Sequence, residues 1–210
     1  MPSLPRPSKI VCVGRNYVAH AAEMGNEVPT DPLIFLKPPS ALIATGEPIV
    51  LPPGVGEVHY EGEIGVLIGE RASWVDEASA LDHVAGILPV NDVTARDLQR
   101  KDNQWSRAKG FDTFCPIGSP KPLSEIDLET LSVITRVNGQ ERQRGETGQM
   151  VFSIPFLIAY ISRIMTLEPG DLMATGTPEG VGPLVDGDVV EIELTGMDVL
   201  TNTVTTRKEG

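Results

Sequence analysis

The sequence predicts a β-rich fold of the α+β class, built from many short strands and few helices. Glycine and proline are frequent, with 21 and 18 residues in a chain of 210, and they are dispersed along the chain as turn residues are. Between these turns lie short apolar or alternating stretches, which are typical of strands. Only residues 153–164 have a clear amphipathic helical pattern, which begins with Ser153 as a plausible N-cap.

The composition limits the partners of the chain. The formal net charge of -12 argues against nucleic acid and anionic membranes, because both need clustered cations. No apolar stretch approaches the ~18 residues of a membrane span, and we expect no signal peptide because the start of the chain lacks an apolar segment. The two cysteines, Cys12 and Cys115, lack a CxxC spacing, so we expect reduced thiols and a cytoplasmic protein.

The strands follow one another at short intervals, and Asn138-Gly139 is a strong signal for a hairpin between two of them. We expect strands at 9–14, 33–36, 48–51, 59–69, 84–90, 131–138, 141–143, 171–174, 189–194 and 199–205.

Shorter helices are expected between some strands. The first covers residues 18–24 and is closed by Gly25, and the second covers residues 74–83. A third runs to about Lys101, with Thr94 as its cap.

Two glutamates inside the apolar stretch 59–69 are candidate metal ligands. In a strand, Tyr60, Ile64, Val66 and Ile68 share one face. Glu61 and Glu63 share the other, where their charges repel each other. A hard divalent cation takes carboxylate oxygens and cancels this repulsion. The alternative is that the pair lies on a solvated strand face.

A third carboxylate lies where an expected strand meets an expected helix. Asp92 follows the strand 84–90, and this position suits a metal ligand. Arg96 and Gln99 share one helical face, three residues apart. The alternative is that Asp92 helps to cap the helix and that Arg96 pairs with a nearby carboxylate.

Three further features are candidates for the site. His20 and Glu23 share a helical face, so the carboxylate can orient the imidazole and raise its basicity; the alternative is a surface pair. Lys37 ends a strand and either lies in solvent or faces a pocket. The loop 176–182 is rich in glycine and can expose N–H groups to a small carboxylate, although it lacks the nucleotide-binding motifs.

Taken in order, these motifs resemble the fumarylacetoacetate hydrolase family, in its short branch of acylpyruvases and oxaloacetate decarboxylases. The matching segments are Val13-Gly14-Arg15-Asn16-Tyr17 with His20 and Glu23, Phe35-Leu36-Lys37-Pro38, His59-Tyr60-Glu61-Gly62-Glu63, Asn91-Asp92-Val93-Thr94-Ala95-Arg96-Asp97, Ala108-Lys109-Gly110-Phe111-Asp112, Val137-Asn138-Gly139 and Thr175-Gly176-Thr177-Pro178-Glu179-Gly180-Val181-Gly182.

The resemblance implies a mixed β-roll or sandwich with short peripheral helices, and usually a homodimer. It implies one catalytic domain at residues 9–206, with a flexible leader at 1–8 and a tail at 207–210. The eponymous enzyme has an extra aspartate ligand upstream of its catalytic histidine, where this chain has Val13 or Gly14. This difference is consistent with the short branch.

The resemblance also implies the ligands and the catalytic groups. Mg²⁺ or Mn²⁺ would be held by Glu61, Glu63 and Asp92, whose hard oxygen donors favour these ions over zinc or copper. The catalytic residues would be His20, Glu23 and Lys109. The substrate-binding residues would be Arg15, Lys37, Arg96, Gln99 and Thr177.

The implied activity is metal-dependent chemistry on 2-oxo acids. It would hydrolyse a C–C bond of acylpyruvates, decarboxylate oxaloacetate, or do both, through a metal-bound pyruvate enolate. One alternative is a 2-hydroxyhepta-2,4-diene-1,7-dioate isomerase or 5-oxopent-3-ene-1,2,5-tricarboxylate decarboxylase of aromatic catabolism. The connector 100–105 is more typical of that branch. Another is a non-catalytic, metal-stabilised domain that binds dicarboxylates, but binding alone needs no base such as His20.

Overall fold

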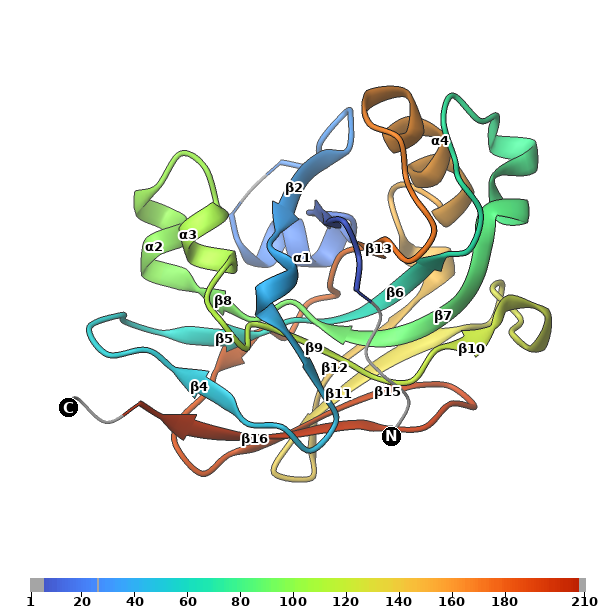
Figure 1. Ribbon diagram of the computed structural model, residues 1–210. Helices are drawn as coiled ribbons and strands as arrows, with labels where there is room; N and C mark the ends of the chain where they lie inside the picture. The colour runs from blue at the N-terminus through green and yellow to red at the C-terminus, as the bar shows by residue number, and fades with distance from the viewer. Residues whose placement is uncertain (1–5, 26, 208–210) are drawn as a thin grey trace.

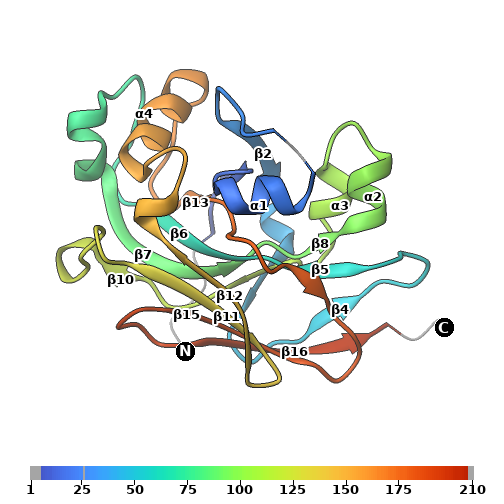
Figure 2. The ribbon, with the colours of Figure 1, turned by 180° about the vertical axis from the view of Figure 1, so that it is seen from behind.

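The computed structural model describes residues 6–25 and 27–207, and these residues form three β-sheets with the α-helices gathered on one side (Figures 1 and 2). This β-rich, mixed architecture confirms the predicted fold class. The strands are β1 (Ile10–Gly14), β2 (Leu33–Lys37), β3 (Leu42–Ala44), β4 (Ile49–Leu51), β5 (Val58–Tyr60), β6 (Gly62–Ile68), β7 (Val84–Asn91), β8 (Thr94–Ala95), β9 (Cys115–Ile117), β10 (Lys121–Pro122), β11 (Ser132–Val137), β12 (Gln140–Glu146), β13 (Leu172–Ala174), β14 (Gly182–Pro183), β15 (Val189–Leu194) and β16 (Leu200–Thr206).

The largest sheet carries the long central pair β6 and β7. Within the described residues its order is β2-β1-β13-β6-β7-β9-β3, with β10 also paired to β7. A second sheet has the order β12-β11-β15-β16-β4 and lies below β6 and β7 in Figure 1. A small third sheet joins β14, β5 and β8.

The core forms where the two larger sheets face each other. Ile64, Val66 and Ile68 of β6 pack in one buried cluster with residues of β11, β15 and β16, and Tyr60 belongs to the same cluster. These four residues are the apolar face that the alternation predicts. Glu63 is on the opposite side of β6 by strand alternation, so it points away from this core.

The expected single strand 59–69 is wrong in one respect, because it divides at Glu61. Tyr60 ends β5 in the third sheet, and Gly62 begins β6 in the first. At the break, the Glu61 N–H donates to Asn91 Oδ1 (2.9 Å) and the Glu61 carbonyl accepts from the Asp92 N–H (2.8 Å). The chain can therefore change sheets without leaving buried backbone groups unpaired.

The helices are α1 (Val18–Glu23), α2 (Arg96–Lys101), α3 (Ser106–Lys109) and α4 (Ile154–Ile164), with 3₁₀ turns η1 (Pro39–Ala41), η2 (Glu77–His83), η3 (Leu123–Glu125) and η4 (Thr147–Gln149). The α4 prediction is confirmed, since the Phe156 N–H donates to the Ser153 hydroxyl (3.3 Å).

Two helix predictions need correction. In place of the expected helix 74–83, only the 3₁₀ turn η2 forms, at Glu77–His83. Trp74 lies outside it and has a positive φ of 55°, which no right-handed helix accommodates. Thr94 does not cap α2. It lies in β8, and its hydroxyl donates to the Asp92 carbonyl (2.8 Å).

Other sequence predictions are confirmed. The β11–β12 hairpin turns through Asn138 and Gly139, both with positive φ. Cys12 and Cys115 are buried free thiols. No helix in the described part of the chain is long and apolar enough to cross a bilayer.

Residues 1–5 of the expected leader and 208–210 of the expected tail lie outside the described residues.

Candidate metal centre and active site

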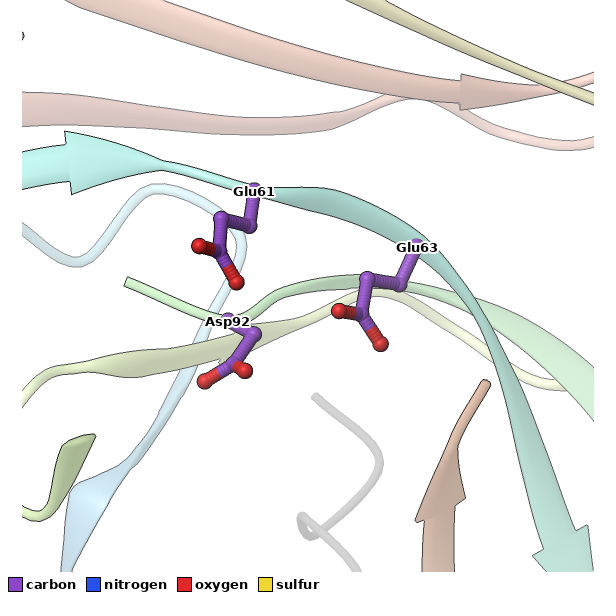
Figure 3. A group of neighbouring side chains, drawn as sticks. All are labelled: Glu61, Glu63 and Asp92. Carbon is purple, nitrogen blue, oxygen red and sulfur yellow. The ribbon is translucent and has the colours of Figure 1, made fainter. Parts of the chain in front are cut away.

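Three buried carboxylates meet where β6 begins and β7 ends. Glu61 lies at the break before β6, Glu63 lies in β6, and Asp92 directly follows β7. Figure 3 shows both glutamate side chains directed to the same side as Asp92. One oxygen from each residue can be chosen so that all lie within 4.8 Å of one another. The residues that the sequence predicts as metal ligands are therefore together.

Three buried cations surround these carboxylates. The Lys109 ammonium donates to Glu61 Oε2 (2.7 Å) and to Asp92 Oδ2 (2.5 Å). Arg96 Nη2 lies 2.5 Å from Glu61 Oε1. The Lys37 ammonium donates to Asp92 Oδ1 (2.5 Å) and to the Val93 carbonyl (3.2 Å). Three formal negative charges are thus balanced by three formal positive charges in a buried cluster.

The cations are distributed unevenly among the carboxylates. Burial alone would raise the pKa of Glu61, but Lys109 and Arg96 outweigh it and hold that pKa well below its usual value. Burial, and then the charges of Asp92 and Glu61, raise the pKa of Glu63. The Gly176 N–H donates to Glu63 Oε2 (2.8 Å). This bond favours the charged carboxylate of Glu63, but it does not outweigh the effects that raise the pKa. Glu63 therefore lacks sufficient positive charge nearby.

This arrangement fits a hard divalent cation. A group of carboxylate oxygens at this spacing suits Mg²⁺ or Mn²⁺, which prefer oxygen ligands. The ion would supply the positive charge that Glu63 lacks. Lys109 and Lys37 hold Asp92 from two directions, so its carboxylate is oriented before any ion arrives.

His20 and Glu23 interact as the sequence predicts. His20 Nδ1 lies 3.3 Å from Glu23 Oε2. The Gly180 N–H lies within hydrogen-bond distance of both oxygens of Glu23 (3.0 and 3.1 Å), so α1 is joined to the glycine-rich loop. Burial lowers the pKa of His20, and the carboxylates of Glu61 and Glu23 oppose this effect. The neutral imidazole, which can accept a proton, is favoured.

These groups line one cavity of about 540 Å³. Most of the residues that the sequence predicts for the site contribute to its wall: Arg15, His20, Glu23, Glu61, Glu63, Asp92, Arg96, Gln99, Lys109 and Thr177.

Lys37 is the predicted residue that is placed differently. Its side chain is buried and bonded to Asp92, outside the set of described residues that line the cavity.

Two of the predicted substrate-binding residues are held by hydrogen bonds of their own. Arg96 Nη1 donates to Gln99 Oε1 (2.6 Å), which fixes the two residues side by side. Thr177 is buried and donates to the Gly62 carbonyl (2.9 Å).

Sequence reasoning missed several lining residues, among them His59, Arg100 and Trp105. His59 begins the stretch 59–69 that carries Glu61 and Glu63, and this position was a usable signal. Trp105 was the one apolar residue of a polar connector, and its ring packs edge-on against Phe35 (centroids 5.2 Å apart). Arg100 gave no signal, because an exposed arginine on a helix is ordinary.

The family comparison covers almost all of the chain. The model described as fumarylacetoacetate (FAA) hydrolase C-terminal matches residues 9–205.

Several curated relatives have names that refer to oxaloacetate. The chain is 47% identical over 196 residues to the mitochondrial oxaloacetate decarboxylase of Dictyostelium discoideum, covering 90% of each chain. It is 45% identical over 193 residues to the mitochondrial oxaloacetate tautomerase FAHD1 of Mus musculus, covering 90% of this chain and 87% of the relative.

Solved structures of related enzymes have the same fold. A 5-carboxymethyl-2-hydroxymuconate delta-isomerase from Mycobacterium smegmatis matches with a TM-score of 0.90 and 48% identity, covering 97% of this chain and 81% of that one. A fumarylpyruvate hydrolase from Pseudomonas aeruginosa, solved in complex with Mn²⁺ and pyruvate, matches with a TM-score of 0.90 and 33% identity, covering 96% and 91%.

Proposed function

Because this chain belongs to the fumarylacetoacetate hydrolase family, we propose that it is a divalent-metal-dependent enzyme that forms the enolate of 2-oxo acids, with oxaloacetate as the first substrate to test. It would decarboxylate oxaloacetate, hydrolyse acylpyruvates, or do both. The observation that carries this proposal is the position of the carboxylates Glu61, Glu63 and Asp92 beside His20 and Lys109 in one cavity.

The proposed ion is Mg²⁺ or Mn²⁺, held by Glu61, Glu63 and Asp92. When bound, it would act as a Lewis acid that draws negative charge towards the 2-oxo oxygen of the substrate. The Mn²⁺ in the fumarylpyruvate hydrolase structure supports this assignment by similarity.

Lys109 would stabilise the charge that develops on the substrate. Burial alone would lower its pKa, but Asp92 and Glu61 outweigh burial and raise it, so the ammonium stays protonated. Two of its three N–H donors bond to Glu61 and Asp92, and the third remains for an oxygen of the substrate. In this role it stabilises the enolate by charge.

His20 would act as the general base. Glu23 holds Nδ1, which leaves Nε2 for a water molecule or for a proton at C3 of the substrate. With an acylpyruvate, the activated water attacks the distal carbonyl, the C–C bond breaks, and the enolate of pyruvate leaves. With oxaloacetate, loss of CO₂ gives the same enolate and needs no water. Transfer of a proton between C3 and the 2-oxo oxygen, without C–C cleavage, would amount to tautomerisation, the reaction named for the mouse relative.

Arg96, Gln99 and Arg15 would bind the carboxylates of the substrate. Thr177 would contribute through backbone N–H groups of the glycine-rich loop, because its hydroxyl proton is donated to the Gly62 carbonyl. The charge balance supports a dicarboxylate: the buried cluster is formally neutral, so a divalent cation adds two positive charges that a dianion would cancel. Lys37 would assist indirectly by holding Asp92.

We propose a cytoplasmic homodimer as the working form. The free, buried thiols of Cys12 and Cys115 suit a reducing compartment. Light scattering on the purified protein tests the dimer.

The test of the proposed function is the rate of pyruvate formation from oxaloacetate and acetylpyruvate, with Mg²⁺ or Mn²⁺ and with a chelator. Blanks with metal alone correct for spontaneous decarboxylation of oxaloacetate, and loss of the enol absorbance reports tautomerisation. We expect enzyme-dependent turnover that the chelator abolishes. Absence of turnover in all three assays would overturn the proposal. In that case, metal-dependent isomerisation of a 2-hydroxy-dienedioate would favour the alternative, which the similarity to the mycobacterial isomerase supports.

A further inference from the structure

Gln143 is a buried amide on β12 whose hydrogen bonds all reach segments of the proposed site. Its Oε1 accepts from the Gly62 N–H (3.0 Å), and its Nε2 donates to Thr177 Oγ1 (2.8 Å) and to the Pro178 carbonyl (2.8 Å). Its exposed fraction is 1%. Both N–H donors and the carbonyl of the amide are therefore used, which leaves the side chain a single orientation.

Gly62 is the point at which this amide meets the proposed metal ligands. It lies between Glu61 and Glu63, and its N–H and carbonyl are bonded to Gln143 and to Thr177 Oγ1. A Cβ at Gly62 would lie 2.0 Å from Thr135 Oγ1 and 3.0 Å from Ile192 Cδ1, on β11 and β15. The second sheet therefore fixes the backbone between the two glutamates by direct contact and through Gln143.

We propose that Gln143 is a positioning residue. It holds the proposed ligands Glu61 and Glu63 in a fixed position relative to the substrate-binding Thr177. This inference rests on the proposed function. Gln143 lies outside the set of described residues that line the cavity, so it acts through Gly62 and Thr177. Groups that orient metal ligands in this way typically change metal affinity by about 10–100-fold when removed.

The test compares two substitutions at Gln143 with a control on the same strand. Gln143→Leu removes all three hydrogen bonds at similar volume. Gln143→Glu preserves the shape of the side chain and an acceptor for the Gly62 N–H, but loses the amide donors. Gln140→Leu is the control, because Gln140 is exposed and its side chain accepts a bond from Arg142. Mn²⁺ binding is measured by electron paramagnetic resonance, with KM and kcat at saturating Mn²⁺ and the unfolding temperature alongside.

We expect Gln143→Leu to weaken Mn²⁺ binding about 10–100-fold and to raise KM, with Gln140→Leu within twofold of the wild type in both. Gln143→Glu should raise KM with a smaller loss of Mn²⁺ affinity, since the bond to Gly62 remains. If Gln143→Leu fails to fold, Gln143→Glu decides the outcome, because it keeps the size of the side chain and an acceptor for the Gly62 N–H.

A double-mutant cycle with Thr177→Val tests the route through Thr177. On that background the effect of Gln143→Glu on KM should largely disappear. An equal effect on both backgrounds would overturn this route.

A merely structural role predicts a different result. If the variants of Gln143 have a lower unfolding temperature but bind Mn²⁺ and substrate as the wild type does, the inference is overturned and the proposed function stands. If the wild type itself neither binds Mn²⁺ nor turns over substrate, the proposed function fails, and the inference fails with it.

Discussion

At the scale of single residues, the surroundings of His20 and Lys109 give these two basic side chains opposite protonation states. Burial lowers the pKa of His20, which favours the neutral ring and a role as base. At Lys109, Asp92 and Glu61 outweigh burial and raise the pKa, which favours the cation. The site therefore contains a proton acceptor, which the proposed hydrolysis requires, and a fixed positive charge, which would stabilise an enolate in either proposed reaction.

His20→Ala should separate the two proposed reactions. Hydrolysis of acetylpyruvate needs an activated water, so its kcat/KM should fall about 10²-fold or more. Decarboxylation of oxaloacetate needs no water and should fall less. His83→Ala is the control, because His83 lies in η2, away from the lining of the cavity. Equal losses in both reactions would contradict the role of His20 in activating water.

The pH profile of hydrolysis should reflect the lowered pKa of His20. The base form is lost only as pH falls through that pKa, so the acidic limb of kcat/KM should lie below about 6.5, the ordinary value for histidine. Glu23 raises the pKa of His20, and Glu23→Gln should therefore shift this limb to still lower pH while the rate decreases. A shift to higher pH would show that another group is the base.

The cluster of acidic residues could be predicted from the sequence, whereas the place of Lys37 could not. The two glutamates in an apolar stretch made a metal site a candidate, the family motifs added Asp92, and the three side chains do converge. A lysine at the end of a strand has no such signal. Its contact with Asp92 depends on the packing of β2 near the end of β7, which local sequence does not encode.

At the scale of elements, β6 lies so close to the second sheet at Gly62 that no side chain fits between them. Gly62 has no room for a Cβ beside Thr135 and Ile192, so glycine is required there by close approach rather than by backbone conformation. Gly139 shows the opposite case. Its φ is 74°, and no atom lies within 4 Å of the place that a Cβ would take, so only the turn conformation requires glycine.

Gly62→Ala and Gly139→Ala should therefore differ in their effects. Gly62→Ala should cost about 1–3 kcal/mol through overpacking, and should weaken Mn²⁺ binding because Glu61 and Glu63 move with the strand. Gly139→Ala should cost about 1–2 kcal/mol through the left-handed conformation, with metal affinity unchanged. Urea unfolding and Mn²⁺ titration of both variants measure this. Unchanged metal affinity in Gly62→Ala would contradict the coupling of this contact to the site.

The elements also show where local patterns stop being sufficient. The alternation in 59–69 predicted the buried face of β6 correctly, because period-two burial is local. It missed the break at Glu61, which depends on hydrogen bonds to Asn91 and Asp92 from another strand. Likewise, Thr94 suits a cap in sequence, but its hydroxyl bonds to the Asp92 carbonyl instead.

At the scale of the whole molecule, an acidic chain gathers several of its few cations around one cavity, beside an equal number of carboxylates. The formal net charge is -12, yet Lys109 and Arg96 are buried around the proposed metal ligands, and Arg15 and Arg100 line the same cavity. An anionic substrate would therefore bind through these local cations and the proposed ion, because the overall charge would repel it. The family resemblance predicted Arg15, Arg96 and Lys109 at the site, whereas the net charge alone indicated no position for any cation and nothing pointed to Arg100.

The proposed metal site at Glu61, Glu63 and Asp92 predicts that Mn²⁺ stabilises the folded chain. An ion that binds only the folded state at 100 times its Kd adds about 2.7 kcal/mol to the free energy of unfolding, or about 5–10 °C in Tm for a chain of this size. Glu63→Gln should remove most of this shift and still fold, because its amide oxygen can accept from the Gly176 N–H and no buried lysine loses a partner. Glu70→Gln, at an exposed position just after β6, should keep the full shift. Since the ligands belong to the ends of two paired strands, an equal shift in Glu63→Gln and the wild type would mean that Mn²⁺ binds elsewhere on this acidic surface.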